Sequence, residues 1–262
     1  MFTSVFPPLT ITDDVTLSVV DSSLTKEWQV EIDENLTSKL LTGLKPNKSA
    51  GNDRLSTRLL KFSRDVLAAP LTHLYAESLL HCTVHVRWKD AIISPVPKCS
   101  NPSLDDFRPV SLLPIPAKIL EKIVLTSIKA QLIDLYGDNQ YGFRPKSSTL
   151  NAHLAIHDYV TRSLDSSVCD GVAMIALDLS KAYDRVSHLS LLQTLVHGNL
   201  PKRFILWIRN FLTMRTQKVV FNGTSSSREV PVSSGVPQGS VLAPVLFAAQ
   251  AGSLHALLPQ TK

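Results

Sequence analysis

The stretch MIALDLSKAYDRV, Met174 to Val186, contains the pattern from which the fold of this chain is first predicted. An apolar run ends there on Asp178, and a second acid, Asp184, follows six residues later. Consecutive apolar positions are typical of a central strand that is covered on both faces. The sequence therefore predicts a buried strand over residues 171–179 with a carboxylate at its end.

Two interpretations of Asp178 follow from the residues alone. A carboxylate at a strand end can bind a hard divalent cation through oxygen, and Mg²⁺ takes few protein carboxylates because it keeps much of its water. The backbone carbonyl of Leu179 could then supply another oxygen. Alternatively, Asp178 caps the turn that follows the strand. The sequence leaves both interpretations open.

The rest of the chain predicts an α+β fold rather than a parallel doubly wound sheet. A short strand is expected to end at Pro95, and Asn222-Gly223 lies between alternating residues that indicate a hairpin. Asp33 or Asn35 is a plausible cap of the first helix, and an interruption is expected near Pro70. Apolar residues recur at helical spacing in segments 31–44, 55–81, 117–135, 149–166, 189–199 and 201–213.

Composition narrows the class of protein further. The chain has 262 residues, of which 44% are hydrophobic and 19% charged, as in ordinary globular proteins. Three scattered cysteines without a C-x-x-C pair argue against structural zinc and a disulfide framework, and favour a reducing compartment. The start lacks the pattern of a secretory signal, and the longest apolar run is too short for a bilayer span.

Charge is distributed unevenly along the chain. The net charge is +5, yet residues 1–50 contain seven acids and four bases. From Lys181 to Lys262 there are nine bases and two acids, a balance of +7. A basic region of this kind suits a polyanion such as nucleic acid, although a solvated face without a partner has the same composition.

Two further motifs contain residues that could bind a nucleotide or another ligand. In SSGVPQGSVLAPVLF, residues 233–247, Gly235 and Gly239 flank Pro237-Gln238, a constrained turn that lets backbone approach a ligand closely. Gln238 could hydrogen-bond a nucleotide or template there, and the alternative is a plain turn before a helix. Lys98 and Arg108 lie on either side of a polar loop that could fold two cations over a triphosphate, or that is only solvated.

Five blocks in order resemble those of reverse transcriptases of non-LTR (LINE-type) retrotransposons. They are LKPNKSAGNDRLSTRLLK, WKDAIISPVPKCSNPSLDDFRPVSLLPIPAKILEKIV, DNQYGFRPKSSTLNAH, ALDLSKAYDRV and SSGVPQGSVLAPVLF, and the resemblance runs from about Leu41 to Phe247. The resemblance implies a right-hand polymerase with fingers, an incomplete palm containing a small antiparallel sheet, and flanking helices. It divides the chain into a poorly defined segment 1–40, fingers-like helices 41–170, a partial palm 171–247 and a divergent tail 248–262.

The resemblance also implies a role for individual residues. Asp178 matches a catalytic metal-binding aspartate, with the carbonyl of Leu179 beside it, in a site that holds two Mg²⁺ ions in the intact family. Asp184 is not a metal ligand in the family and is expected to cap the next helix or to pair with Arg185 or Lys181. The implied nucleotide-binding residues are Lys98, Arg108, Tyr183 and Gln238. The implied template-binding residues are Gln140, Arg144, Gly235, Pro237 and Gly239.

The partners implied by the resemblance are an RNA template, a DNA primer and dNTPs, with no membrane and a nuclear or cytoplasmic location. The Tyr-x-Asp-Asp block that supplies further carboxylates in the family does not follow in this sequence, which has no Asp or Glu after Glu229. We therefore expect that the chain is truncated and does not polymerise DNA by itself. The alternatives are a noncatalytic remnant that binds RNA or RNA–DNA hybrid, and a product that never folds stably.

Overall fold

A computed structural model describes residues 26–166, 170–221, 224–225 and 228–254. The fold is mixed α+β, as the sequence predicts. The helices are α2 (Glu34–Thr42), α3 (Thr57–Phe62), α4 (Arg64–His81), α5 (Ile115–Asp134), α6 (Thr149–Asp165), α7 (His188–His197), α8 (Lys202–Leu212) and α9 (Ala243–Leu254), with short 3-10 turns η1 (Val86–Trp88), η2 (Leu104–Asp106) and η3 (Ala182–Arg185). The strands are β1 (Ala91–Pro97), β2 (Phe107–Leu112), β3 (Arg215–Phe221), β4 (Thr224–Ser225) and β5 (Val230–Val232).

The five strands form one sheet in the order β2-β1-β3-β4, with β5 also paired to β3. β1 and β2 are antiparallel, and Val96 lies opposite Arg108. β1 and β3 are parallel, with Ile92 opposite Lys218, so the sheet is mixed rather than purely antiparallel as expected. The predicted hairpin is confirmed by the antiparallel pairing of β3 with β4, although Asn222 and Gly223 themselves lie outside the described residues.

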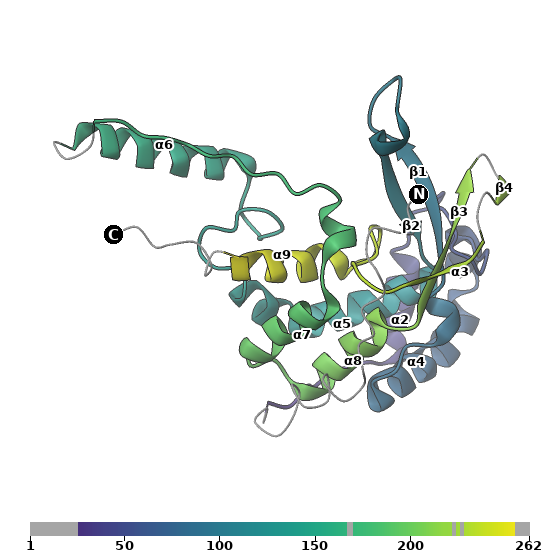
Figure 1. The fold of residues 1–262 in the computed structure, drawn as a ribbon. Coiled ribbons are helices and arrows are strands. Elements are labelled where there is room, and N and C mark those ends of the chain that lie inside the picture. Colours follow the sequence, from purple (N-terminus) through teal and green to yellow (C-terminus); the bar gives the residue numbers. More distant parts are fainter. Residues whose placement is uncertain (1–25, 167–169, 222–223, 226–227, 255–262) are drawn as a thin grey trace.

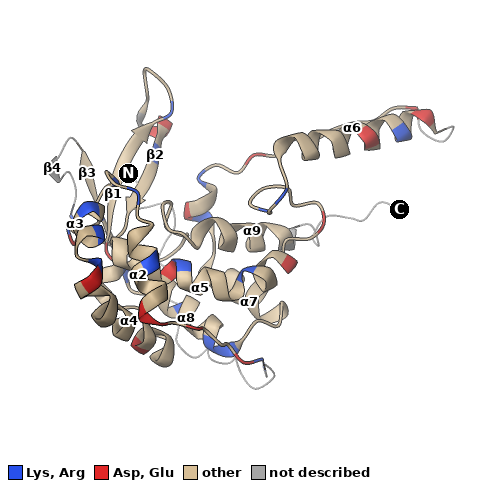
Figure 2. Cartoon of the chain, turned by 180° about the vertical axis from the view of Figure 1, so that it is seen from behind, with Lys and Arg blue, Asp and Glu red and all other residues tan. Residues whose placement is uncertain are grey.

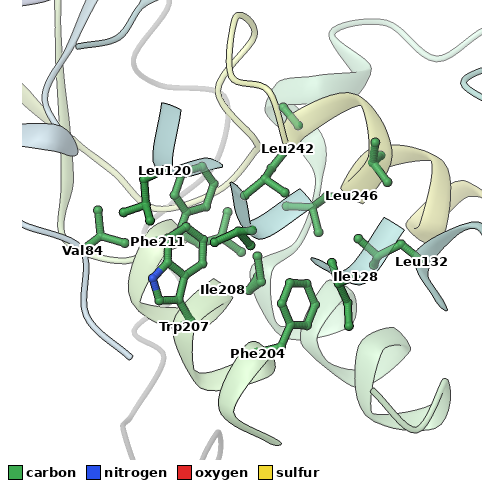
Figure 3. Close-up of a cluster of buried hydrophobic side chains, with 14 of the residues drawn as sticks. Val84, Leu120, Ile128, Leu132, Phe204, Trp207, Ile208, Phe211, Leu242 and Leu246 are labelled. Atoms are coloured by element: carbon green, nitrogen blue, oxygen red, sulfur yellow. The ribbon is translucent and has the colours of Figure 1, made fainter. Parts of the chain in front are cut away.

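The main hydrophobic core lies where α5 meets α8 and α9 (Figure 3). Trp207 on α8 is completely buried, stacks on Phe211 with ring centroids 5.6 Å apart, and donates to the hydroxyl of Ser78 at 3.1 Å. The hydroxyl of Tyr75 on α4 donates to the Pro116 carbonyl at 3.0 Å, which connects α4 to the start of α5. Burial of these large side chains is the main source of stability.

Most predicted helices are present, and their ends have local causes. The Asp33 carboxylate accepts from the Leu36 amide at 2.7 Å and caps α2, which confirms one of the two expected caps. The predicted interruption near Pro70 is wrong, because the break falls at Ser63 and Pro70 lies inside α4. Pro70 lacks the amide that would otherwise donate to the Val66 carbonyl one turn earlier. Because Val66 is 77% exposed, water can reach this side of the helix.

The strand predicted over residues 171–179 is not formed. Met174 is 72% exposed, and Ile175 and Leu177 are each 83% exposed. The sequence pattern specifies burial on both faces, but a strand also requires backbone hydrogen-bonding partners beside it. In the described part of the chain none of the five strands pairs with this segment, so its apolar side chains have no sheet to join.

The helix α6 extends away from the helical body, and the segment that follows runs back alongside it (Figure 1). None of the residues of α6 is buried. Cys82 and Cys99 are free thiols, and Cys169 lies outside the described residues. Among the described helices, none has the length and apolar character needed to cross a membrane.

Candidate functional site

The loop between β1 and β2 presents two of the predicted cations. The backbone amide of Lys98 donates to the Asp106 carbonyl at 2.8 Å, which closes the loop. Its ammonium donates to the Asp105 carbonyl at 3.2 Å. Ser103 and Asp106 form a reciprocal capping box, and these hydrogen bonds lower the pKa of the Asp106 carboxyl. The loop thus has a defined shape between Lys98 and Arg108, both of which are exposed.

The predicted turn at Pro237-Gln238 lies against β2. The Ser111 amide donates to the Gln238 carbonyl at 2.7 Å. Gly239 has φ +139°, and a Cβ added there would lie 2.3 Å from the Ser111 carbonyl oxygen. Gly235 has φ +86°, and a Cβ there would lie 2.8 Å from the Asp184 Cα. Both glycines therefore permit a backbone conformation and a close approach that other residues do not.

Tyr183 occupies η3, immediately beside this turn. Its carbonyl accepts from the Val236 amide at 2.9 Å, and the Val186 carbonyl accepts from the Gly235 amide at 2.8 Å. The Tyr183 ring stacks on Phe247 of α9, with centroids 5.0 Å apart and planes 15° apart. Burial raises the pKa of its hydroxyl. The ring is therefore held by packing from α9.

A cavity of about 170 Å³ lies between the β1–β2 loop, η3 and the Pro237-Gln238 turn. It is lined by Lys98, Arg108, Tyr183 and Gln238, the four residues that the sequence resemblance assigns to nucleotide binding. They come from segments up to 140 positions apart, and the fold brings them to one site.

Several lining residues were not predicted as part of the site, and two of them, Lys181 and Asp105, are paired with each other. The Lys181 ammonium lies 3.3 Å from the Asp105 carboxylate, an ion pair that joins η3 to the β1–β2 loop across the cavity. The sequence offered one signal for Lys181, its position two residues before Tyr183. Sequence patterns gave no reason to select Asp105 over its neighbour Asp106.

Asp184 also lines this cavity, and burial raises the pKa of its carboxyl while Lys181 lowers it. Of the two roles expected for Asp184, the cap of the next helix is wrong, whereas the charge interaction with Lys181 is present. Ser187 caps α7 instead, because its hydroxyl accepts from the Ser190 amide at 3.3 Å. Asp184 lies within η3, too early in the chain to reach the first amides of α7.

Asp178 and Leu179 do not line the cavity. Both are exposed, at the end of the segment that does not form a strand. Within the described ranges no group of three or more His, Cys, Asp or Glu residues could hold a metal ion. Two divalent cations need several carboxylates, so the described arrangement does not fit a two-metal centre around Asp178.

Gln140 and Arg144 lie away from the cavity, in the turns that follow α5. The Gln140 side-chain amide donates to the Gly142 carbonyl at 3.1 Å, and Arg144 donates to the Asp138 carbonyl at 3.5 Å. Arg144 also lies near Tyr136, whose hydroxyl pKa burial raises to about 12. The structure does not bring these two predicted template residues to the site that contains Gln238.

The basic excess of the C-terminal third is partly structural. Arg203 donates to the carbonyls of Leu79 and Leu80, at 3.0 and 2.8 Å, at the end of α4. Arg215 is 3% exposed and donates to the Phe211 carbonyl at 3.0 Å. Figure 2 shows charges of both signs dispersed over the described elements. Sequence charge alone therefore overstates the basic surface.

Lys89, just before β1, is 3% exposed, and burial next to Arg215 lowers the pKa of its ammonium to about 8. The unfolded chain keeps this proton up to about pH 10.4, so the free energy of unfolding should rise with pH between about 8 and 10. We expect Lys89→Met to be more stable than the parent by roughly 1 to 3 kcal/mol at pH 7. The difference should shrink by pH 10.

Urea denaturation of parent and Lys89→Met at pH 7, 8, 9 and 10 measures this difference. Lys129→Met, a substitution of an exposed lysine on α5, is the matched control and should leave both stability and its pH slope unchanged. Stability curves for parent and Lys89→Met that stay parallel across this range would contradict the expected titration.

Comparison with known proteins gives consistent matches. The family described as reverse transcriptase (RNA-dependent DNA polymerase) matches residues 96–261. The RNA-directed DNA polymerase from mobile element jockey of Drosophila melanogaster is 30% identical over 85% of this chain and 24% of its own length. The probable RNA-directed DNA polymerase from transposon X-element of the same species is 30% identical over 77% of this chain and 22% of its own length. The chain thus spans about a quarter of the length of these relatives.

Proposed function

The chain belongs to the reverse transcriptase family, in its non-LTR retrotransposon group, and on this premise we propose that the 170 Å³ cavity binds the nucleoside triphosphate used in RNA-directed DNA synthesis. One observation carries the proposal. Lys98, Arg108, Tyr183 and Gln238 line one cavity although they come from three separate segments. An arrangement of cations, an aromatic ring and an amide matches the triphosphate, sugar and base of a nucleotide.

Each lining residue has a distinct part in this proposal. Lys98 and Arg108 bind the triphosphate from the β1–β2 loop, where both side chains are exposed and the Lys98 ammonium would exchange its bond to the Asp105 carbonyl for one to a phosphate oxygen. Tyr183 lies under the sugar, where its stacked ring would clash with a 2′-hydroxyl. Gln238 contacts the base or its template partner from the floor of the site, together with the backbone of Gly235, Pro237 and Gly239.

The larger arrangement is likewise proposed. Residues 41–170 form a fingers-like region, residues 171–247 a partial palm, and residues 1–40 and 248–262 the flanking segments. Gln140 and Arg144 bind the template at a distance from the nucleotide. Asp178 provides one oxygen ligand for a divalent cation, Mg²⁺ in our proposal, with the carbonyl of Leu179 beside it. The described residues do not complete that metal site.

The cations of the β1–β2 loop give a direct test. Lys98→Ala and Arg108→Ala should each weaken binding of a dNTP about 10- to 100-fold, since each removes a charge-assisted contact worth roughly 1.5 to 3 kcal/mol. Binding of the corresponding deoxynucleoside monophosphate should change much less. Titration calorimetry or fluorescence anisotropy with a labelled dNTP measures both affinities.

The matched control is Lys129→Ala, which removes an exposed charge on α5 that does not line the cavity. It lowers net charge by the same amount and should bind dNTP like the parent. If Lys98→Ala, Arg108→Ala and Lys129→Ala all weaken binding equally, the effect is one of general charge, and the proposed triphosphate site is wrong.

A further inference from the structure

The helix α5 contains one fully enclosed carboxylate, that of Glu121. Its residue is 2% exposed, and burial raises the pKa of the carboxyl. Its neighbours in the chain, Ile119, Leu120 and Ile123, are all buried hydrophobic residues. An acid at such a position costs free energy of desolvation unless it is hydrogen-bonded. Its contacts therefore indicate what it stabilises.

All three hydrogen bonds of Glu121 go to one short segment some 120 positions away. Oε2 accepts from the Ser240 hydroxyl, from the Val241 amide at 2.7 Å and from the Leu242 amide at 3.1 Å. The Ser240 hydroxyl in turn accepts from the amides of Leu242 and Ala243, both at 3.1 Å. The carboxylate thus accepts from the two amides just before α9, and the Ser240 hydroxyl accepts from the amide that begins it.

This segment directly follows the turn that forms the floor of the nucleotide cavity. Only Gly239 separates Ser240 from Gln238, and the Ser240 amide donates to the Pro237 carbonyl at 3.0 Å. On the other side of the turn, His188 Nε2 bonds the Gly235 carbonyl at 2.8 Å. Burial lowers the pKa of that imidazole, so its neutral form with a proton on Nε2 is the donor.

The turn is therefore held at both ends by buried side chains from helices. His188 on α7 fixes its start, Glu121 on α5 fixes its end, and the Ser111 amide fixes its middle. Since Gly239 itself adds conformational freedom, the orientation of Gln238 depends on what holds the residues after it. None of these contacts is local in sequence.

We infer that Glu121 is a positioning residue for nucleotide binding, which holds Gln238 in the cavity by fixing Ser240 and the two amides that follow. The inference rests on the proposed nucleotide site. A simpler role, in which Glu121 only stabilises the start of α9, predicts loss of stability without a selective change at the turn. The positioning role predicts weaker binding of dNTP but not of inorganic triphosphate, and faster exchange of the amides in the turn. The simpler role predicts faster exchange in α9 alone.

The first experiment compares two ligands in Glu121→Leu and Glu121→Gln. Glu121→Leu should weaken dNTP binding by about 10-fold or more, whereas inorganic triphosphate, which needs only Lys98 and Arg108, should bind as to the parent. Glu121→Gln, which keeps an acceptor oxygen, should recover most of the dNTP affinity. Lys122→Leu, an exposed neighbour on the same helix, is the control. Equal loss of both ligands in Glu121→Leu, or no loss of either, would overturn the inference.

The second experiment does not depend on nucleotide. Hydrogen–deuterium exchange at the amides of residues 235–242 should accelerate about 10-fold or more in Glu121→Leu, with little change in α7 and α8. Faster exchange confined to α9 would reduce Glu121 to a helix-stabilising residue and refute its positioning role. If exchange accelerates in Glu121→Leu as expected but the parent chain binds no dNTP, the proposed function is refuted while the contact from Glu121 to the turn is supported.

Discussion

Gly239→Ala is expected to weaken dNTP binding by about 100-fold, which corresponds to roughly 2.7 kcal/mol. A methyl group there would lie 2.3 Å from the Ser111 carbonyl oxygen, and the residue would keep a φ of +139° that L-residues rarely adopt. Either the turn moves away from β2 or the strand shifts. In both cases Gln238 leaves its place, because its carbonyl is bonded to the Ser111 amide.

The measurement is dNTP affinity by calorimetry, with inorganic triphosphate as the second ligand. Gly171→Ala is the matched control, because a Cβ at Gly171 would meet no atom within 4 Å. Inorganic triphosphate should still bind to Gly239→Ala, since Lys98 and Arg108 lie on a different segment. A variant that binds dNTP as tightly as the parent would show that the position of Gln238 does not matter.

Trp207→Ala should reduce the free energy of unfolding by about 3 to 5 kcal/mol. The indole is completely buried between α5, α8 and α9, stacks on Phe211 and donates to Ser78. Its removal leaves a cavity and takes away one hydrogen bond of the Ser78 hydroxyl, which still donates to the Thr83 carbonyl. Folded domains have only about 5 to 15 kcal/mol in total, so the loss is a large fraction.

Urea denaturation followed by far-ultraviolet circular dichroism measures this change. Phe62→Ala removes an aromatic side chain that is 83% exposed and should change stability by less than about 0.5 kcal/mol. Similar losses in Trp207→Ala and Phe62→Ala would contradict the assignment of the core to the junction of α5, α8 and α9.

Sequence signals correctly predicted the elements whose formation depends on residues that are close together in the chain. The Asp33 cap, the long helix α5 and the β3–β4 hairpin each follow from residues within a few positions of each other. The segment 171–179 shows the limit of such signals. Its apolar pattern is that of a buried strand, but strand formation depends on a partner that the pattern does not name.

The residues of the candidate site likewise comprise some that the sequence predicted and some that it did not. Motif resemblance selected Lys98, Arg108, Tyr183 and Gln238, and the fold places them around one cavity. Glu121 and His188 were missed because their partners are distant in the sequence, 119 to 121 positions away for Glu121 and 47 positions away for His188. No local rule predicts such contacts. The one available signal was the acid in the apolar stretch ILEKIV, which a helical projection places among buried positions.

The parallel pairing of β1 with β3 has a consequence for synthesis of the chain. Ala91 pairs with Gln217, 126 positions later, so β1 has only β2 beside it until β3 has left the ribosome. At about 5 to 20 residues per second, this interval lasts roughly 6 to 25 s. During that time the apolar face of α5 also waits for α8 and α9. A nascent chain of this protein therefore spends many seconds with a half-built sheet, and its unpaired strand edge and exposed apolar surface are prone to aggregation during that period.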